Sequence, residues 1–217
     1  MSLKVSRVTV GRVILCVLGN IILGLGVALC KTSNFGTDPF NSLCLSVSGA
    51  ISSHEMAFPI FTWCFNLTLF LVVIIWGRRY IHIGTFVNWF LPSYVAKTVL
   101  AVTKPFLGDV QSLWIRALLL AAGILAISFG LALYQHVDLG IAPYDAIPLM
   151  VIDRFPKAKF FIIRIALDAS AVIGSLIAGG IAMKTLGIGT AIIAFGLGPC
   201  INMYTYLIWG RKEKSSS

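Results

Sequence analysis

The chain has 217 residues, of which 58% are hydrophobic and only 12% are charged, and its mean hydropathy is +0.93. A chain with so few polar residues cannot cover the surface of a water-soluble globule. The composition therefore predicts an integral membrane protein, with the lipid bilayer as its partner. The net charge of +9 does not indicate a nucleic-acid partner, because the Lys and Arg residues lie in clusters between apolar runs, where they set orientation in the bilayer.

Six apolar runs are long enough to cross a bilayer, because a helix through about 30 Å of hydrocarbon needs about 20 apolar residues. The first run follows a basic stretch but is too long for the core of a signal peptide, so it is predicted as an uncleaved helix. The runs cover residues 13–30, 57–76, 83–102, 113–134, 160–179 and 186–208.

Two short segments carry a repeated motif. The sequence GTDPFN at residues 36–41 comes back as GIAPYD at residues 140–145, and each is preceded at the same distance by a glycine-rich apolar run. The match resumes at the tripeptide IGT, residues 83–85 and 188–190, whose Gly and Thr are typical of close helix packing. The chain is therefore predicted to be duplicated, with repeats at 1–107 and 108–217 that together form one transmembrane domain.

The segment after each motif is too short and too interrupted for a comfortable span. Residues 39–53 contain Asn41 and several serines, and residues 143–153 are broken again by Pro148. We expect two half-helices whose N-terminal ends lie inside the protein, because irregular backbone at membrane depth must be buried or line a wet cavity. The predicted helix breaks are Gly36, Pro39, Gly140 and Pro143.

Two topologies follow from these half-helices. If they turn back, the chain has six transmembrane helices plus two re-entrant segments, and the repeats are inverted because each contains an odd number of spans. If they cross, there are eight helices in parallel repeats. Cytoplasmic termini satisfy the positive-inside rule in both cases. The predicted fold class is an all-α polytopic membrane protein, with inverted repeats favoured and eight helices as the alternative.

The loops after the two half-helices favour the inverted arrangement. The first loop, residues 52–55, contains no Lys or Arg, whereas the second, residues 154–159, contains three. Inverted repeats place equivalent loops on opposite sides of the membrane, and therefore need opposite charge bias at these two positions.

Carboxylates near the half-helix starts are candidates for a binding site, because each charge at membrane depth costs about 2.5 to 3.5 kcal/mol on insertion scales. Asp145, beside Tyr144, lies near the start of the second half-helix, and Asn41 is its counterpart in the first. Asp38 supplies a carboxylate from the first motif. Each carboxylate can either cap backbone N–H groups or hold a proton or cation at a site.

A third carboxylate, Asp168, lies near the middle of the apolar run at residues 160–179, and Asn66 is its repeat counterpart. Arg164 lies one turn before Asp168, so a self-neutralising pair is the alternative to a functional role.

No catalytic, metal or cofactor signature is present in the sequence. The five cysteines fall in or beside apolar segments and show neither metal spacing nor a disulfide framework. There is also no GxSxG motif, no Walker loop and no His/Glu/Asp metal spacing. We therefore predict no enzyme activity, no metal and no cofactor.

The repeated GxxP motif with its trailing Asn or Asp, the two IGT tripeptides and the overall length resemble the YczE/YyaS/YitT family of bacterial membrane proteins. The resemblance runs from about Arg12 to Trp209. It implies a multi-pass protein of the bacterial plasma membrane, in the short form without a soluble C-terminal domain, and it implies no settled activity. Asn41 stands where the second half has Asp145, so the resemblance does not imply a carboxylate pair at equivalent positions.

These observations favour a secondary transporter with a small-molecule site between the repeats, coupled to protons through Asp145 or Asp168. Two half-helix N-termini would favour a substrate with an anionic group. The alternatives are a channel for a small solute and a non-transporting membrane scaffold or accessory protein. The oligomeric state is left open between a monomer and a homo-oligomer.

Overall fold

The structure of the chain, a computed structural model, describes residues 10–54, 56–77, 80–107, 112–137, 139–158, 160–181 and 184–210. These residues form helices and no strand, which confirms the all-α prediction. The helices are α1 Val10–Thr32, α2 Pro39–Ile51, α3 Ala57–Trp76, α4 Ile83–Leu107, α5 Leu113–His136, α6 Pro143–Arg154, α7 Phe160–Ile177 and α8 Ile188–Trp209.

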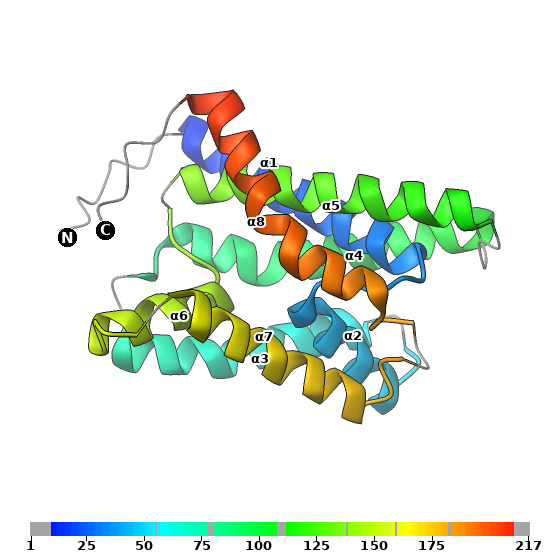
Figure 1. Ribbon diagram of the computed structural model, residues 1–217, viewed down its shortest axis with the longest axis horizontal. Helices are drawn as coiled ribbons and strands as arrows, with labels where there is room; N and C mark the ends of the chain where they lie inside the picture. The colour runs from blue at the N-terminus through cyan, green and yellow to red at the C-terminus, as the bar shows by residue number, and fades with distance from the viewer. Residues whose placement is uncertain are drawn as a thin grey trace.

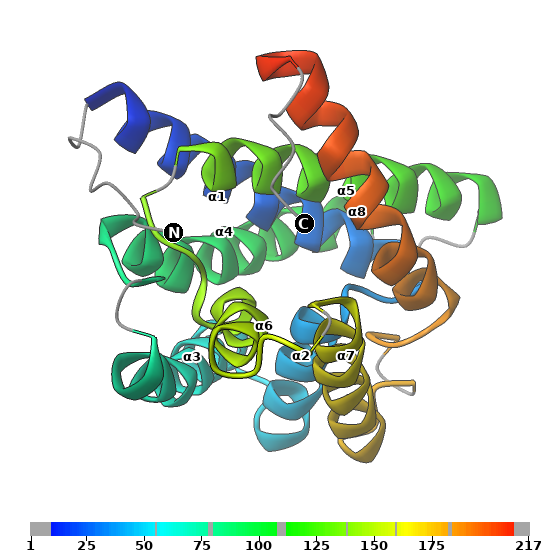
Figure 2. The ribbon, with the colours of Figure 1, turned by 60° about the vertical axis from the view of Figure 1, so that its left-hand side comes forward.

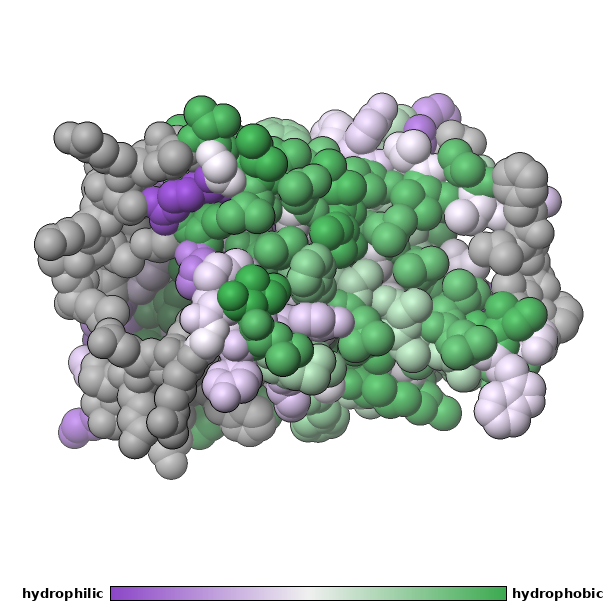
Figure 3. Space-filling model, turned by 90° about the horizontal axis from the view of Figure 1, so that it is seen from above, coloured by the Kyte–Doolittle hydropathy of each residue, from purple (hydrophilic) through white to green (hydrophobic). Residues whose placement is uncertain are grey.

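Four of the described helices, α1, α3, α5 and α8, are long and apolar enough to cross a bilayer, as predicted. The face seen in Figure 3 is apolar across its middle and becomes more hydrophilic towards the two ends of the long axis, as a bilayer requires. The other two predicted spans, α4 and α7, form helices of 25 and 18 residues. They carry charged residues within them, Lys97 and Lys104 in α4 and Arg164 and Asp168 in α7.

The helices form two layers (Figures 1 and 2). In the first layer α1 packs on α5, α4 packs on α1 and α8 packs on α5. In the second layer α2 packs on α7 and α6 packs on α3. The layers are therefore built from segments far apart in the sequence, and helices from both predicted repeats meet in each.

The contact between α1 and α5 is made by glycines. A Cβ atom added at Gly19 would lie 2.8 Å from the carbonyl oxygen of Gly130, and one added at Gly26 would lie 2.8 Å from that of Gly123. These spacings leave no room for a larger side chain, so the two antiparallel helices approach backbone to backbone, as small residues allow in membranes.

The two predicted half-helices are α2 and α6, which begin at Pro39 and Pro143. They have 13 and 12 residues, so each is about 20 Å long at 1.5 Å per residue. Figure 1 shows both beginning near the middle of the second layer, α2 then running towards the right and α6 towards the left.

The two half-helices are held by different chemistry. Ser46 of α2 shares hydrogen bonds with Ser175 of α7 at 2.8 Å and with Thr185 beyond it at 2.5 Å, and Ser42 lies 2.9 Å from Ser175. Ala146 and Met150 of α6 pack instead in an apolar cluster with Val73 of α3 and with Tyr80, which follows α3. One hydrogen bond adds to this cluster, from the hydroxyl of Tyr80 to Oδ2 of Asp153 on α6 at 2.6 Å.

A glycine turn precedes each half-helix. Gly36 and Gly140 have φ angles of 108° and 113°, a backbone conformation that glycine adopts without strain. A Cβ added at Gly36 would lie 2.4 Å from Oγ1 of Thr190, and one added at Gly140 would lie 2.5 Å from Oγ1 of Thr85. Each turn is therefore packed against the IGT segment of the other half of the chain.

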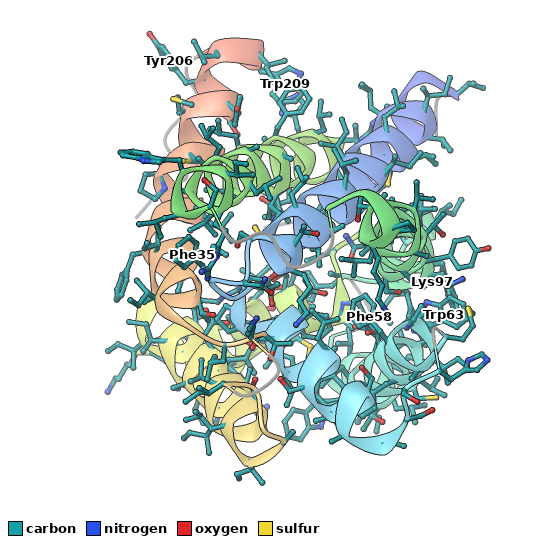
Figure 4. All side chains as sticks on the ribbon, turned by 90° about the vertical axis from the view of Figure 1, so that its right-hand side faces the viewer. Phe35, Phe58, Trp63, Lys97, Tyr206 and Trp209 are labelled. Carbon is teal, nitrogen blue, oxygen red and sulfur yellow. The ribbon has the colours of Figure 1, made fainter. Side chains whose placement is uncertain are left out.

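Backbone hydrogen bonds fix the same arrangement. The N–H of Gly189 donates to the carbonyl of Phe35 at 2.8 Å, and the N–H of Gly84 donates to that of Leu139 at 2.7 Å. Figure 4 shows Phe35 between α1 and α8. The IGT glycines and threonines thus pack against a turn, whereas close helix–helix packing was expected of them.

Candidate functional site

A cavity of about 540 Å³ lies between the two layers, with walls from both. The starts of α2 and α6 reach it, and the middle of α7 faces it. Its wall includes all the residues that the sequence singled out as site candidates: Asp38, Asn41, Asn66, Tyr144, Asp145 and Asp168. The helix breaks at Gly36 and Gly140 place the half-helix starts there, and Pro39 itself is part of the wall.

Arg164 joins two of the carboxylates. Its Nη1 donates to Oδ1 of Asp145 at 2.6 Å, and its Nε donates to Oδ2 of Asp168 at 3.1 Å. The predicted pair of Arg164 and Asp168 is therefore one side of a triad that ties α7 to the start of α6. The sequence could not reveal the second contact, because Asp145 is on another helix.

Two tyrosines complete the hydrogen bonding of this triad. The hydroxyl of Tyr134 donates to Oδ2 of Asp145 at 3.0 Å, and that of Tyr144 donates to Oδ1 of Asp168 at 2.8 Å. The guanidinium of Arg164 also lies over the Tyr144 ring, 5.3 Å from its centroid. Each carboxylate thus accepts from one tyrosine and from the same arginine. Tyr144 was a predicted site residue, whereas Tyr134 was missed because nothing in an apolar run marks one tyrosine as inward-facing.

Asp38 has a different role at the start of α2. Its Oδ1 accepts from the backbone N–H of Asn41 at 3.1 Å, and its Oδ2 accepts from the side-chain amide of the same residue at 2.9 Å. Of the two alternatives for this carboxylate, the structure shows the helix cap. Asp145 makes no such cap on α6 and faces Arg164 instead.

A chain of amides lies at the α1–α4 side of the cavity. The amide of Asn88 donates to Oδ1 of Asn20 at 2.8 Å, and the amide of Asn20 donates to the carbonyl of Cys16 at 2.8 Å. Sequence reasoning missed both asparagines, although an amide inside an apolar run is a readable signal. Among the described residues, every buried side-chain nitrogen and oxygen has a hydrogen-bond partner.

Comparison with known proteins places the chain in a family. The profile of a family of unknown function, DUF6198, matches residues 10–206. The chain belongs to this family. The match does not name the YczE/YyaS/YitT family, so that resemblance stays a prediction.

The DUF6198 protein is also similar to an uncharacterized protein of Haemophilus influenzae (strain ATCC 51907 / DSM 11121 / KW20 / Rd). The two are 27% identical over 187 residues, which cover 86% of this chain and 80% of the relative. No solved structure matches the chain.

The charge of the cavity wall in this DUF6198 protein is unbalanced. Among the described residues of the wall there are three carboxylates, Asp38, Asp145 and Asp168, and one guanidinium, that of Arg164. When all four are ionised, these described groups leave two negative charges unbalanced, in a setting where unpaired charge is costly. Such a wall can take up protons or a bound cation. Among the described residues, no group of three His, Cys, Asp or Glu is placed to hold a metal ion.

Proposed function

We propose that this DUF6198 protein is a secondary transporter with its substrate site in the cavity of about 540 Å³. The observation that carries this proposal is the charged triad of Arg164, Asp145 and Asp168 on the cavity wall, beside the starts of two half-helices. Charged groups at membrane depth cost free energy and mark substrate or ion pathways. Half-helices that begin near the bilayer midplane are typical of binding sites in secondary transporters.

The transporter is built, in this proposal, from two inverted repeats. The repeated motif makes Gly19 equivalent to Gly123 and makes Gly26 equivalent to Gly130. The contact of Gly19 with Gly130 therefore has an equivalent in the contact of Gly26 with Gly123. When a two-fold axis relates the two repeats, a contact between two residues occurs a second time between their equivalents in the other repeat. Because α1 and α5 are equivalent helices and run antiparallel, the axis relates repeats of opposite orientation in the membrane.

The exchanged hydrogen bonds support the same symmetry. Phe35 and Leu139 are equivalent, as are Gly84 and Gly189, and each carbonyl accepts from the glycine of the other half. In the resulting topology α1, α3, α4, α5, α7 and α8 cross the membrane, and α2 and α6 are re-entrant. The start of α1 and the end of α8 lie at the same end of the molecule (Figure 1).

The distribution of basic residues favours cytoplasmic termini. On the six-span topology, both chain ends and the loops at 77–82 and 155–159 share one side, and most Lys and Arg residues of the sequence are there. The expected location is the bacterial plasma membrane, in keeping with the family resemblance.

A transporter fits the cavity better than the two alternatives. A scaffold would need dry packing around Asp38 and Asp145, but an open volume borders both. A channel needs a continuous polar path, whereas apolar side chains such as Leu23, Val27 and Ile127 share the wall with the charged ones. The titratable Asp145 and Asp168 at the site favour coupling of substrate movement to protons.

Access to the cavity from both sides of the membrane tests this proposal. We expect Ser93→Cys, on the α4 wall of the cavity, in a background without native cysteines, to be labelled by membrane-impermeant methanethiosulfonates from either side. Right-side-out and inside-out vesicles would give the two measurements. Ser128→Cys is the matched control, because the Ser128 side chain on α5 is buried, donates to the carbonyl of Ile124 and does not line the cavity.

Each outcome of this labelling discriminates between the candidate functions. Labelling of Ser93→Cys from both sides, with no steady ion current across the membrane, supports alternating access. Labelling from both sides together with a steady current would favour the channel. Protection from both sides would contradict transport and favour the scaffold.

A further inference from the structure

A second cavity, of about 470 Å³, opens between α7 and α8. Its wall is apolar over most of its area and is formed by residues such as Ile165, Val172 and Ala191. It adjoins the first cavity, because both walls contain Pro39, Arg164, Asp168, Ala194 and Phe195. Arg164 and Asp168 of the charged triad therefore lie at the junction of a polar cavity and an apolar one.

The mouth of the second cavity is flanked by exposed apolar side chains. Phe195 on α8 is 75% exposed, and Ile165 on α7 is 46% exposed. In a membrane protein such side chains face the acyl chains of lipids. The second cavity thus opens sideways, towards the hydrocarbon of the bilayer.

The equivalent gap on the other side of the molecule, between α3 and α4, is closed by aromatic side chains from both helices. The indole N–H of Trp89 donates to the carbonyl of Trp63 at 2.8 Å, and that of Trp63 donates to the carbonyl of Phe90 at 3.1 Å. The ring of Phe70 lies 5.0 Å from that of Trp89 and 5.4 Å from that of Phe86, between centroids. These five residues fill the space between the two helices.

At two positions the open gap has small residues where the closed gap has aromatic ones. Alignment of the two IGT tripeptides pairs Phe86 with Ala191 and Trp89 with Ala194. Both alanines belong to the wall of the second cavity. The sequence of α8 therefore leaves open a gap that the sequence of α4 closes.

The charge of the first cavity determines which head group is favoured in a ligand that enters through the gap between α7 and α8. In the described part of its wall, Asp38, Asp145 and Asp168 outnumber Arg164, so a cationic group is favoured there. The anionic group expected from the sequence is disfavoured, because Asp38 already caps α2 and Asp145 lies in the first turn of α6. Both cavities fall within the roughly 300–1,000 Å³ typical of small-molecule sites.

We propose that the substrate is a single-chain amphiphilic ammonium compound that enters from the bilayer between α7 and α8. Its cationic head lies in the first cavity beside Asp145 and Asp168, and its alkyl chain lies in the second cavity. This inference rests on the proposed transport function and adds to it the class of substrate and its route.

Binding of matched probes to the protein in lipid nanodiscs tests the substrate class. We expect radiolabelled dodecyltrimethylammonium to bind saturably, above the background of empty nanodiscs. Tetramethylammonium has the head without the chain, and dodecyl sulfate has the chain with the opposite charge, so each should compete at least tenfold more weakly. The absence of saturable binding, or equal competition by either compound, would overturn the proposal.

Closing the gap tests the route. The double variant Ala191→Phe/Ala194→Trp installs the residues of the closed gap, and should weaken dodecyltrimethylammonium binding at least tenfold while the protein still elutes as a single species. Leu207→Trp is the control, because Leu207 is 67% exposed on α8 and lines neither cavity. Unchanged binding by the double variant would overturn the lateral route.

The labelling of Ser93→Cys separates the two levels of the proposal. If Ser93→Cys is accessible from both sides but dodecyltrimethylammonium does not bind, the substrate inference fails and transport stands. If Ser93→Cys is protected from both sides, the transport function itself fails.

Discussion

Arg164 sets the charge balance of the cavity, because it is shared by two carboxylates. Without it, Asp145 and Asp168 would face each other's charge with only tyrosine hydroxyls as donors. The guanidinium can bind both at once because its Nε and Nη1 point in different directions. Lysine could not reproduce this geometry.

We expect Arg164→Met to lower the free energy of unfolding by about 1–3 kcal/mol. This is below the roughly 3–5 kcal/mol typical of a broken buried pair, because the Arg164 side chain is about one third exposed. The triple variant Arg164→Met/Asp145→Asn/Asp168→Asn should be milder than Arg164→Met, since no carboxylate then lacks its partner. Thermal unfolding of the purified variants in detergent measures both. A triple variant less stable than Arg164→Met would contradict the triad.

Residues of the candidate cavity wall could be selected from the sequence where the signal was local. Asp38, Asn41, Asp145 and Asp168 could be selected from the repeated motif and from the cost of polar groups in a membrane. The contact of Arg164 with Asp145 could not be predicted, because it depends on how α6 and α7 pack against each other in the folded chain. The contact of Asn20 with Asn88 joins residues on α1 and α4 and is non-local in the same way.

At the level of helices, the starts of α2 and α6 were predicted correctly at Pro39 and Pro143. Glycine and proline act on their own backbone, so their effect is visible in sequence. The packing of each glycine turn on the IGT segment of the other half was not predictable, because it depends on how distant parts of the chain cross. The packing of each turn on the other half of the chain places the starts of α2 and α6 at one cavity.

We expect Gly140→Ala to lower the free energy of unfolding by about 1–3 kcal/mol, because a positive φ strains any residue with a Cβ. The added Cβ would also approach Oγ1 of Thr85. Gly196→Ala is the matched control, since nothing lies near its Cβ position within α8, and alanine in a helix is neutral or stabilising by up to about 1 kcal/mol. Thermal unfolding compares the two variants.

A double variant separates the two destabilising effects of Gly140→Ala, which are the strained φ angle and the close approach of the added Cβ to Thr85. Thr85→Ala in the Gly140→Ala background relieves the close approach but leaves the strained φ, so it should recover only part of the lost stability. Equal stability of Gly140→Ala and Gly196→Ala would show that the turn does not depend on glycine.

At the scale of the whole molecule, composition predicted the membrane-spanning helices, but neither composition nor the repeated motif predicted the two layers. Which helix faces which is decided by side-chain packing, such as the approach of Gly19 to Gly130. The gap between α7 and α8 escaped prediction for the same reason. Ala191 and Ala194 resemble ordinary packing residues until the helices are placed, when they border an open gap.

The two predicted topologies place the end of the first repeat on different sides of the membrane. The first predicted repeat ends at residue 107, where α4 also ends, and Ser112 just before α5 is exposed. Lys157, between α6 and α7, is also exposed. With six spans and inverted repeats these two positions lie on opposite sides of the membrane, whereas with eight spans they share the cytoplasmic side.

We therefore expect Ser112→Cys, in a background without native cysteines, to be labelled by an impermeant maleimide only from outside, and Lys157→Cys only from the cytoplasm. Labelling of intact and inverted vesicles gives the side for each, and labelling after detergent solubilisation controls for reactivity. If both positions are labelled only from the cytoplasm, α2 and α6 cross the membrane. The half-helix starts would then no longer be re-entrant, and the cavity between the layers would lose the architecture on which the transport proposal depends.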